Sequence, residues 1–163
     1  MSPLNLNYFE IFGIDAQISI DIENLNSQYL ILQSRFHPDK FVNATNLEKS
    51  MATRVSTYIN DAYNTLSDLV DRVDYILQLN NYSKDEHTTF KNTNFLSEQM
   101  TLSEKIENAD PSQYEEIKNE ISTKIKEIIL EMKTNLTNKE FDVLFENNSM
   151  VKFYKKNIRQ LSV

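Results

Sequence analysis

Glycine is almost absent from this chain: it occurs once in 163 residues, and proline occurs three times. Tight β-hairpins and phosphate-binding loops depend on glycine because they need positive φ angles. A chain with a single glycine can build few of either, whereas the interior of a helix needs none. The composition therefore predicts an all-α fold and argues against a glycine-rich nucleotide site.

Cysteine is absent, which excludes disulfides and thiolate ligands for zinc or for an iron–sulfur cluster. The only histidines are His37 and His87. His37 and Asp39 make a poor metal site or acid–base pair, because they offer one imidazole and one carboxylate. No serine has the flanking glycines of a nucleophile elbow. We therefore expect no metal, no cofactor and no enzymatic activity.

Acidic residues outnumber basic ones by 24 to 17, which gives a formal net charge of −7. This balance argues against broad binding to nucleic acids or to anionic membranes. The longest apolar runs are far shorter than a membrane span, and residues 1–15 resemble neither a signal peptide nor a transit peptide. We therefore expect a cytoplasmic protein, and the lack of a presequence favours a bacterial cytoplasm over a mitochondrion.

The first half of the chain is dominated by apolar residues three or four positions apart, the spacing of amphipathic helices. It predicts a short helix closed by Gly13, a longer helix ended by Pro38, a third helix from near Asn43 and a fourth over residues 69–79. The segment His37-Pro38-Asp39 then forms a loop between the second and third helices. We predict one compact helical domain over residues 1–79.

The second half predicts three more helices after a polar linker over residues 80–93. The first runs from about Phe95 to Glu107, and the last from about Asn138 to Leu161. Asp110 and Pro111 suit the N-cap and the first position of the helix between them. Short loops make the three helices antiparallel neighbours, so we predict a three-helix bundle over residues 94–163.

Three motifs around the His-Pro-Asp loop resemble those of J-domains, which stimulate ATP hydrolysis in heat-shock-protein-70-type chaperones. Tyr8-Phe9 with Ile11-Phe12-Gly13 is similar to the opening motif of that family. Two later segments are similar to further motifs of that family. The first is Ile59-Asn60-Asp61-Ala62-Tyr63 with Thr65-Leu66, and the second is Arg72 with Tyr75-Ile76-Leu77. A bare His-Pro-Asp tripeptide in a loop is weak support, but its place among these motifs makes the resemblance specific.

The resemblance implies that His37, Pro38, Asp39, Lys40 and Arg35 contact the ATPase domain of the chaperone. Pro38 would stiffen the loop by fixing φ, and Asp39 would make a charge-assisted contact with an arginine of the ATPase. The helix before the loop usually presents a basic face in J-domains, but here Arg35 is its only basic residue. This departure predicts weaker electrostatic steering or a specialised chaperone.

The segment Phe95-Leu96-Ser97-Glu98-Gln99-Met100 resembles the motif that opens the C-terminal domain of the HscB family, the co-chaperones of iron–sulfur-cluster assembly. Together with the J-domain motifs, this resemblance covers nearly the whole chain. It implies a J-domain joined to a three-helix bundle, an IscU-like scaffold protein as cargo and an HscA-like chaperone as partner. We expect a monomer that holds the scaffold and the chaperone together, which raises the local concentration of cargo.

Two apolar stripes run along the first helix of the predicted bundle. At about 100° per residue, Phe95, Leu102 and Ile106 lie on one side of this helix. Leu96 and Met100 lie on a second stripe, about 120° away. One stripe suits the bundle core and the other suits a partner protein. The alternative, in which two neighbouring helices bury both stripes, stays open on the pattern alone.

The scaffold-binding positions of the HscB family fall here on Leu96, Met100, Glu104 and Phe153. Phe153 points away from the apolar side of its own helix, as a contact residue would. Three further positions of the family pattern differ in this chain and predict a weaker or differently tuned scaffold contact. Ser97 and Thr101 replace an apolar and an acidic residue, and Asn108 stands where an acid is common.

Two alternatives to the iron–sulfur co-chaperone stay open on the sequence. The bundle of a J-protein can serve a different cargo or pair two copies of the chain. A helical adaptor without J-domain activity is the third function considered.

Overall fold

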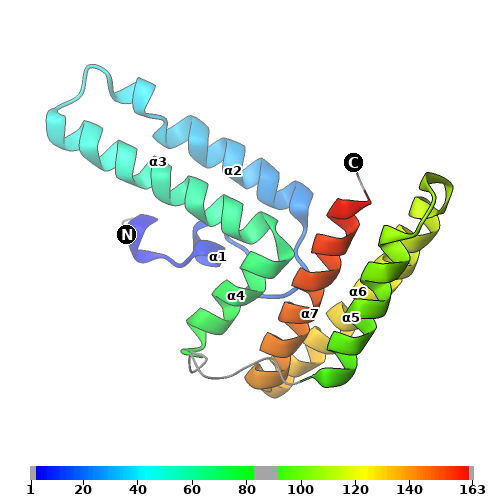
Figure 1. Ribbon diagram of the computed structural model, residues 1–163. Coiled ribbons are helices and arrows are strands. Elements are labelled where there is room, and N and C mark those ends of the chain that lie inside the picture. Colours follow the sequence, from blue (N-terminus) through cyan, green and yellow to red (C-terminus); the bar gives the residue numbers. More distant parts are fainter. Residues whose placement is uncertain (1–2, 83–91, 162–163) are drawn as a thin grey trace. The chain divides into compact units, whose positions relative to one another are not determined.

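The computed structural model describes residues 3–82 and 92–161, and every regular element among them is helical (Figure 1). The all-α prediction is therefore confirmed for the described residues. The chain divides into two compact units, Met1–Ile76 and Leu77–Val163. His87 and most of the predicted linker lie outside the described residues.

The first unit is built around two long helices that form a hairpin, α2 and α3 (Figure 1). Gly13 follows the first short helix with a φ of 64°, a conformation that favours glycine. The elements in chain order are η1 (Pro3–Asn5), α1 (Tyr8–Ile11), α2 (Ile22–Phe36), η2 (Pro38–Phe41), α3 (Asn46–Ser67) and α4 (Leu69–Leu79).

The second unit is an antiparallel bundle of three helices. Its elements are α5 (Thr93–Glu107), η3 (Pro111–Gln113), α6 (Tyr114–Asn138) and α7 (Phe141–Gln160). Asp110 is an N-cap, but of η3 rather than of the long helix as predicted, and its carboxylate accepts the N–H of Ser112. The bundle core includes Ile117, Ile121 and Met132 from α6 and Leu144 and Val151 from α7, each at most 2% exposed.

Two further predicted helix starts were wrong. Helix α3 begins at Asn46 rather than near Asn43, because Thr45 and Glu48 form a capping box that fixes the first turn. Helix α7 begins at Phe141 rather than near Asn138. Lys139 adopts a left-handed conformation with φ 60° that ends α6, so the chain turns there before α7 starts.

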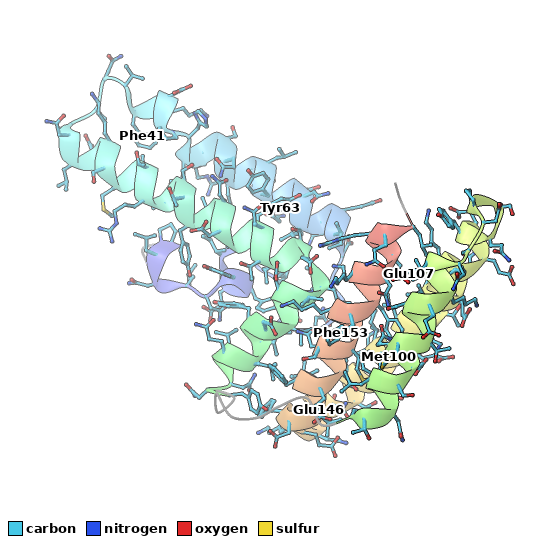
Figure 2. All side chains as sticks on the ribbon, viewed as in Figure 1. Phe41, Tyr63, Met100, Glu107, Glu146 and Phe153 are labelled. Atoms are coloured by element: carbon cyan, nitrogen blue, oxygen red, sulfur yellow. The ribbon has the colours of Figure 1, made fainter. Side chains whose placement is uncertain are left out.

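Paired tyrosines connect the two helices of the hairpin. The rings of Tyr29 on α2 and Tyr63 on α3 stack with centroids 4.1 Å apart (Figure 2 labels Tyr63). The Tyr29 hydroxyl donates to Oδ1 of Asn60 at 3.0 Å, and the Tyr63 hydroxyl donates to Oδ1 of Asn26 at 2.8 Å.

Arg72 is the one buried cation among the described residues, with 5% of its surface exposed. Its Nε donates to the carbonyl of Ile18 at 3.1 Å, and its Nη1 donates to that of Leu66 at 2.5 Å. Burial lowers the pKa of this guanidinium from its ordinary value. Arg72 therefore ties α4 to the end of α3 and to the segment before α2.

Replacing this guanidinium should destabilise the protein. We expect Arg72→Met to lower the free energy of unfolding by about 2 to 4 kcal/mol, because two buried carbonyls lose a charged donor while the apolar volume is largely kept. Urea denaturation checks this. Exposed Arg54 is the matched control, and Arg54→Met should cost no more than about 0.5 kcal/mol. Equal losses for both variants would contradict the anchoring role of Arg72.

Candidate functional site

The His-Pro-Asp segment forms an exposed corner at the tip of the hairpin. Pro38 disfavours helical geometry at His37, whose backbone is extended with φ −60° and ψ 130°, so α2 stops at Phe36. The predicted loop is in part a short 3₁₀ turn, η2, closed by a hydrogen bond from Lys40 N–H to the His37 carbonyl at 3.0 Å. The corner is thus a defined turn.

The polar groups of the corner face solvent. The side chains of His37 and Asp39 are 52% and 87% exposed. Nδ1 of His37 accepts the N–H of Asp39 at 3.3 Å, and the largely exposed Asp39 carboxylate lies 3.5 Å from the same nitrogen. The carboxylate is therefore available to a donor from outside the chain.

Arg35 and Lys40 lie together beside this corner, as members of one shallow hollow. The hollow is lined by Leu30, Ile31, Ser34, Arg35 and Lys40, and we call these five residues the α2 surface. Leu30 and Ile31 are 66% and 51% exposed, and the sequence analysis did not single them out. Their angular position on the helix could have identified them from the sequence, because they lie about 120–140° around α2 from buried Leu25.

The two stripes of α5 are separated as predicted. Phe95, Leu102 and Ile106 are at most 8% exposed, whereas Leu96 is 40% and Met100 is 68% exposed. The alternative in which both stripes are buried is therefore excluded.

Two ion pairs connect α6 to the opposite flank of α5. Lys105 Nζ on α5 lies 2.6 Å from Glu120 Oε2 on α6, and Lys124 of α6 pairs with Glu98 of α5. Leu96 and Met100 lie about 160° around α5 from Glu98, so they point away from α6.

Phe153 completes an apolar surface between α5 and α7. Its ring meets that of Phe95 edge-on at 5.8 Å and is 40% exposed, so it lies beside the first turn of α5, the turn that also carries Leu96. Figure 2 shows the side chains of Met100 and Phe153 on these two neighbouring helices. We call Leu96, Met100 and Phe153 the α5–α7 surface.

Glu104 lies one turn beyond Met100 on α5 and is exposed. It lines a second hollow, at the corner between α5 and α6, together with Thr101 and Asn108. Asn108 is the C-cap of α5, and its Nδ2 donates to the backbone carbonyl of Glu104 at 2.8 Å. The asparagine at this position therefore has a structural use, and an acid there could not make the same bond when ionised.

Neither a metal site nor a membrane span is found in the part of the chain that the structure describes. No three His, Asp or Glu side chains gather there in a way that could hold a metal ion. No helix there is long and apolar enough to cross a membrane.

Comparison with known proteins identifies the family. Residues 91–161 match the family model described as the HSCB C-terminal oligomerisation domain. The co-chaperone HscB homologue of Neisseria meningitidis is 34% identical over 95% of this chain and 96% of its own length. The chain belongs to the HscB co-chaperone family. An HscB homologue of Vibrio cholerae is 43% identical over 65% of each chain.

Solved HscB structures share the whole architecture. Chaperone HscB from Vibrio cholerae has a TM-score of 0.87 at 31% identity, with 96% of each chain covered. Human co-chaperone protein HscB has a TM-score of 0.88 at 26% identity, covering 96% of this chain and 81% of its own. The expected J-domain followed by a C-terminal helical domain is therefore confirmed. So is the expected class, a non-enzymatic co-chaperone of iron–sulfur-cluster assembly.

The two stripes of α5 should respond differently to truncation. Leu102→Ala should lower the free energy of unfolding by about 2 to 5 kcal/mol, because it leaves a cavity in the bundle. Met100→Ala should change it by no more than about 0.5 kcal/mol, because the side chain is mostly exposed. Urea denaturation of both variants makes the comparison. A large loss for Met100→Ala would mean that this side chain is buried in solution.

Proposed function

We propose that this chain delivers an IscU-like iron–sulfur scaffold protein to an HscA-like chaperone of the heat-shock-protein-70 type and stimulates its ATPase. The observation that supports this most is the pair of exposed features on two separate units. One is the His-Pro-Asp corner of the first unit, and the other is the α5–α7 surface of the second.

The chaperone-binding end consists of His37, Pro38 and Asp39, with Lys40 and Arg35 beside them. The short turn holds the Asp39 carboxylate in solvent, where it can accept a charge-assisted hydrogen bond from an arginine of the ATPase domain. Because the turn is fixed by Pro38 and by its own hydrogen bonds, little conformational entropy is lost on docking.

The scaffold-binding end consists of Leu96, Met100 and Phe153, with Glu104 at its edge. Three exposed apolar side chains on packed helices suit the apolar centre of a protein interface. Exposed Glu104 and Glu107 give this surface an acidic rim, which suits a partner with basic residues around its own apolar contact.

The mechanism is a two-ended tether. The bundle holds the scaffold while the J-domain docks on the ATP-bound chaperone, and hydrolysis then closes the chaperone on its substrate. Holding both partners raises the effective concentration of the scaffold at the chaperone without any new contact between them.

The proposal assigns residues 1–79 to the J-domain, 80–93 to a linker and 94–163 to the scaffold-binding domain. Within the assigned linker, the Tyr82 hydroxyl donates to Oδ1 of Asp142 at 2.7 Å, so this residue already contacts α7. We further propose a monomer in a bacterial cytoplasm, in line with the bacterial relatives. The family description of residues 91–161 as an oligomerisation domain makes a dimer the competing arrangement.

The J-domain assignment is tested by His37→Gln. We expect this variant to fold, to bind the scaffold with unchanged affinity and to lose stimulation of the chaperone's ATPase, because only the exposed corner is altered. Steady-state ATP hydrolysis by the HscA-like chaperone is the measurement. Asn43→Gln, another exposed change after the turn, is the control and should stimulate normally. Normal stimulation by His37→Gln would show that the corner is not a J-domain loop.

The scaffold surface is tested by a Leu96→Ala, Met100→Ala double variant. Central apolar anchors can each contribute about 2 kcal/mol or more, so we expect scaffold affinity to fall at least about 30-fold. Stimulation of the ATPase without scaffold should not change. Titration calorimetry with the IscU-like protein measures the affinity. Leu130 on α6, which is 63% exposed, provides the matched control Leu130→Ala.

Sedimentation over a range of concentrations separates the scaffold surface from a dimer interface. The proposal requires the unmodified chain to sediment as a monomer and the double variant to bind scaffold weakly. A concentration-dependent dimer that the double variant abolishes would assign Leu96 and Met100 to self-association instead.

A further inference from the structure

We infer that the chaperone docks on the α2 surface mainly through apolar contact with Leu30 and Ile31, rather than through electrostatic attraction to a basic helix. This inference rests on the proposed function, because it names how the same J-domain recognises its partner. Leu30 and Ile31 then determine in part which chaperone is bound, a role that the family resemblance does not assign to them.

The first support is exposure. Leu30 and Ile31 are 66% and 51% exposed, and they are neighbours on one helix. Both lie on the outer side of α2, away from buried Leu25, so no fold requirement explains them. Adjacent exposed apolar residues on a packed helix indicate a contact with another molecule.

The second support is position. Leu30 and Ile31 share one hollow with Arg35 on the last turn of α2 and with Lys40 in η2. The N–H of Lys40 donates to the His37 carbonyl, so the hollow lies directly beside the His-Pro-Asp turn. A protein that contacts this turn therefore meets the two apolar side chains as part of the same face.

The third support is charge. Within α2, Arg35 is the only basic residue and Glu23 is an acidic one, so the helix carries no basic stripe. Long-range attraction to an acidic surface cannot be strong without such a stripe, and salt screens what there is. The main source of affinity on this helix is therefore the burial of apolar surface, which contributes about 25 cal/mol for each Å² buried.

These points fit the chaperone better than a second copy of this chain. A stable dimer needs roughly 1,000 Å² or more of buried surface, and a hollow of five residues falls well short of that by itself. For the chaperone, the apolar pair adds to the contact made by the turn. The matching surface on the ATPase domain should be an apolar depression with an acidic group opposite Arg35 and Lys40.

The test is ATPase stimulation of the HscA-like chaperone by a Leu30→Gln, Ile31→Gln double variant. We expect the concentration for half-maximal stimulation to rise at least about 30-fold, because both apolar contacts are lost. For the unmodified chain it should change less than about threefold between roughly 50 and 300 mM NaCl. Arg35→Gln should shift it less than the apolar double variant does.

The controls separate this inference from the function on which it rests. Leu130→Gln changes an exposed leucine of the other unit and should stimulate normally. If His37→Gln loses stimulation while Leu30→Gln, Ile31→Gln keeps it, the apolar docking is wrong and the J-domain stands. If neither variant loses it, the proposed stimulation of the chaperone through the His-Pro-Asp corner itself fails. A steep salt dependence of the unmodified chain, or a dimer that the double variant dissociates, would also overturn apolar docking.

Discussion

The conformation that Pro38 imposes on His37 is the constraint on which the proposed chaperone-binding end depends. Because His37 is extended, α2 ends at Phe36. The capping box of Thr45 and Glu48 then starts α3 only after the turn is complete. The stacked tyrosines then keep the two helices together below the turn. A continuous helix would place His37 and Asp39 on a regular helical face, where they could not project as a corner.

Both candidate surfaces use the same physical arrangement, a helix that is buried on one side and apolar on another. In α2 the buried side is marked by Leu25 and the exposed side by Leu30 and Ile31. In α5 the same contrast separates Phe95 from Met100. Packing of the inner side fixes the outer side chains on a rigid backbone, which lowers the entropic cost of binding a partner. Placing one such surface on each unit is what a tether requires.

The sequence predicted the helices and the separation of the two stripes of α5, because helical periodicity reports which residues share a face. It misplaced the start of α3, since the cap of Thr45 depends on a turn that periodicity does not describe. It also missed Gln99, which is 8% exposed and accepts a hydrogen bond from Asn157 inside the bundle. Such polar pairs are not recognisable until the two helices are placed together. Leu30 and Ile31 were missed, although their positions around α2 relative to Leu25 could have set them apart from the buried side of the helix.

Site-specific photo-cross-linking tests the central claim most directly, that each unit presents its own binding surface to a different partner. A benzophenone side chain placed at exposed Ser34, in the α2 surface, and in a second protein at exposed Ser97, beside Leu96, would be irradiated with both partners and ATP. The account predicts an adduct with the chaperone alone from position 34 and with the scaffold alone from position 97. Adducts with the same partner from both positions would contradict it.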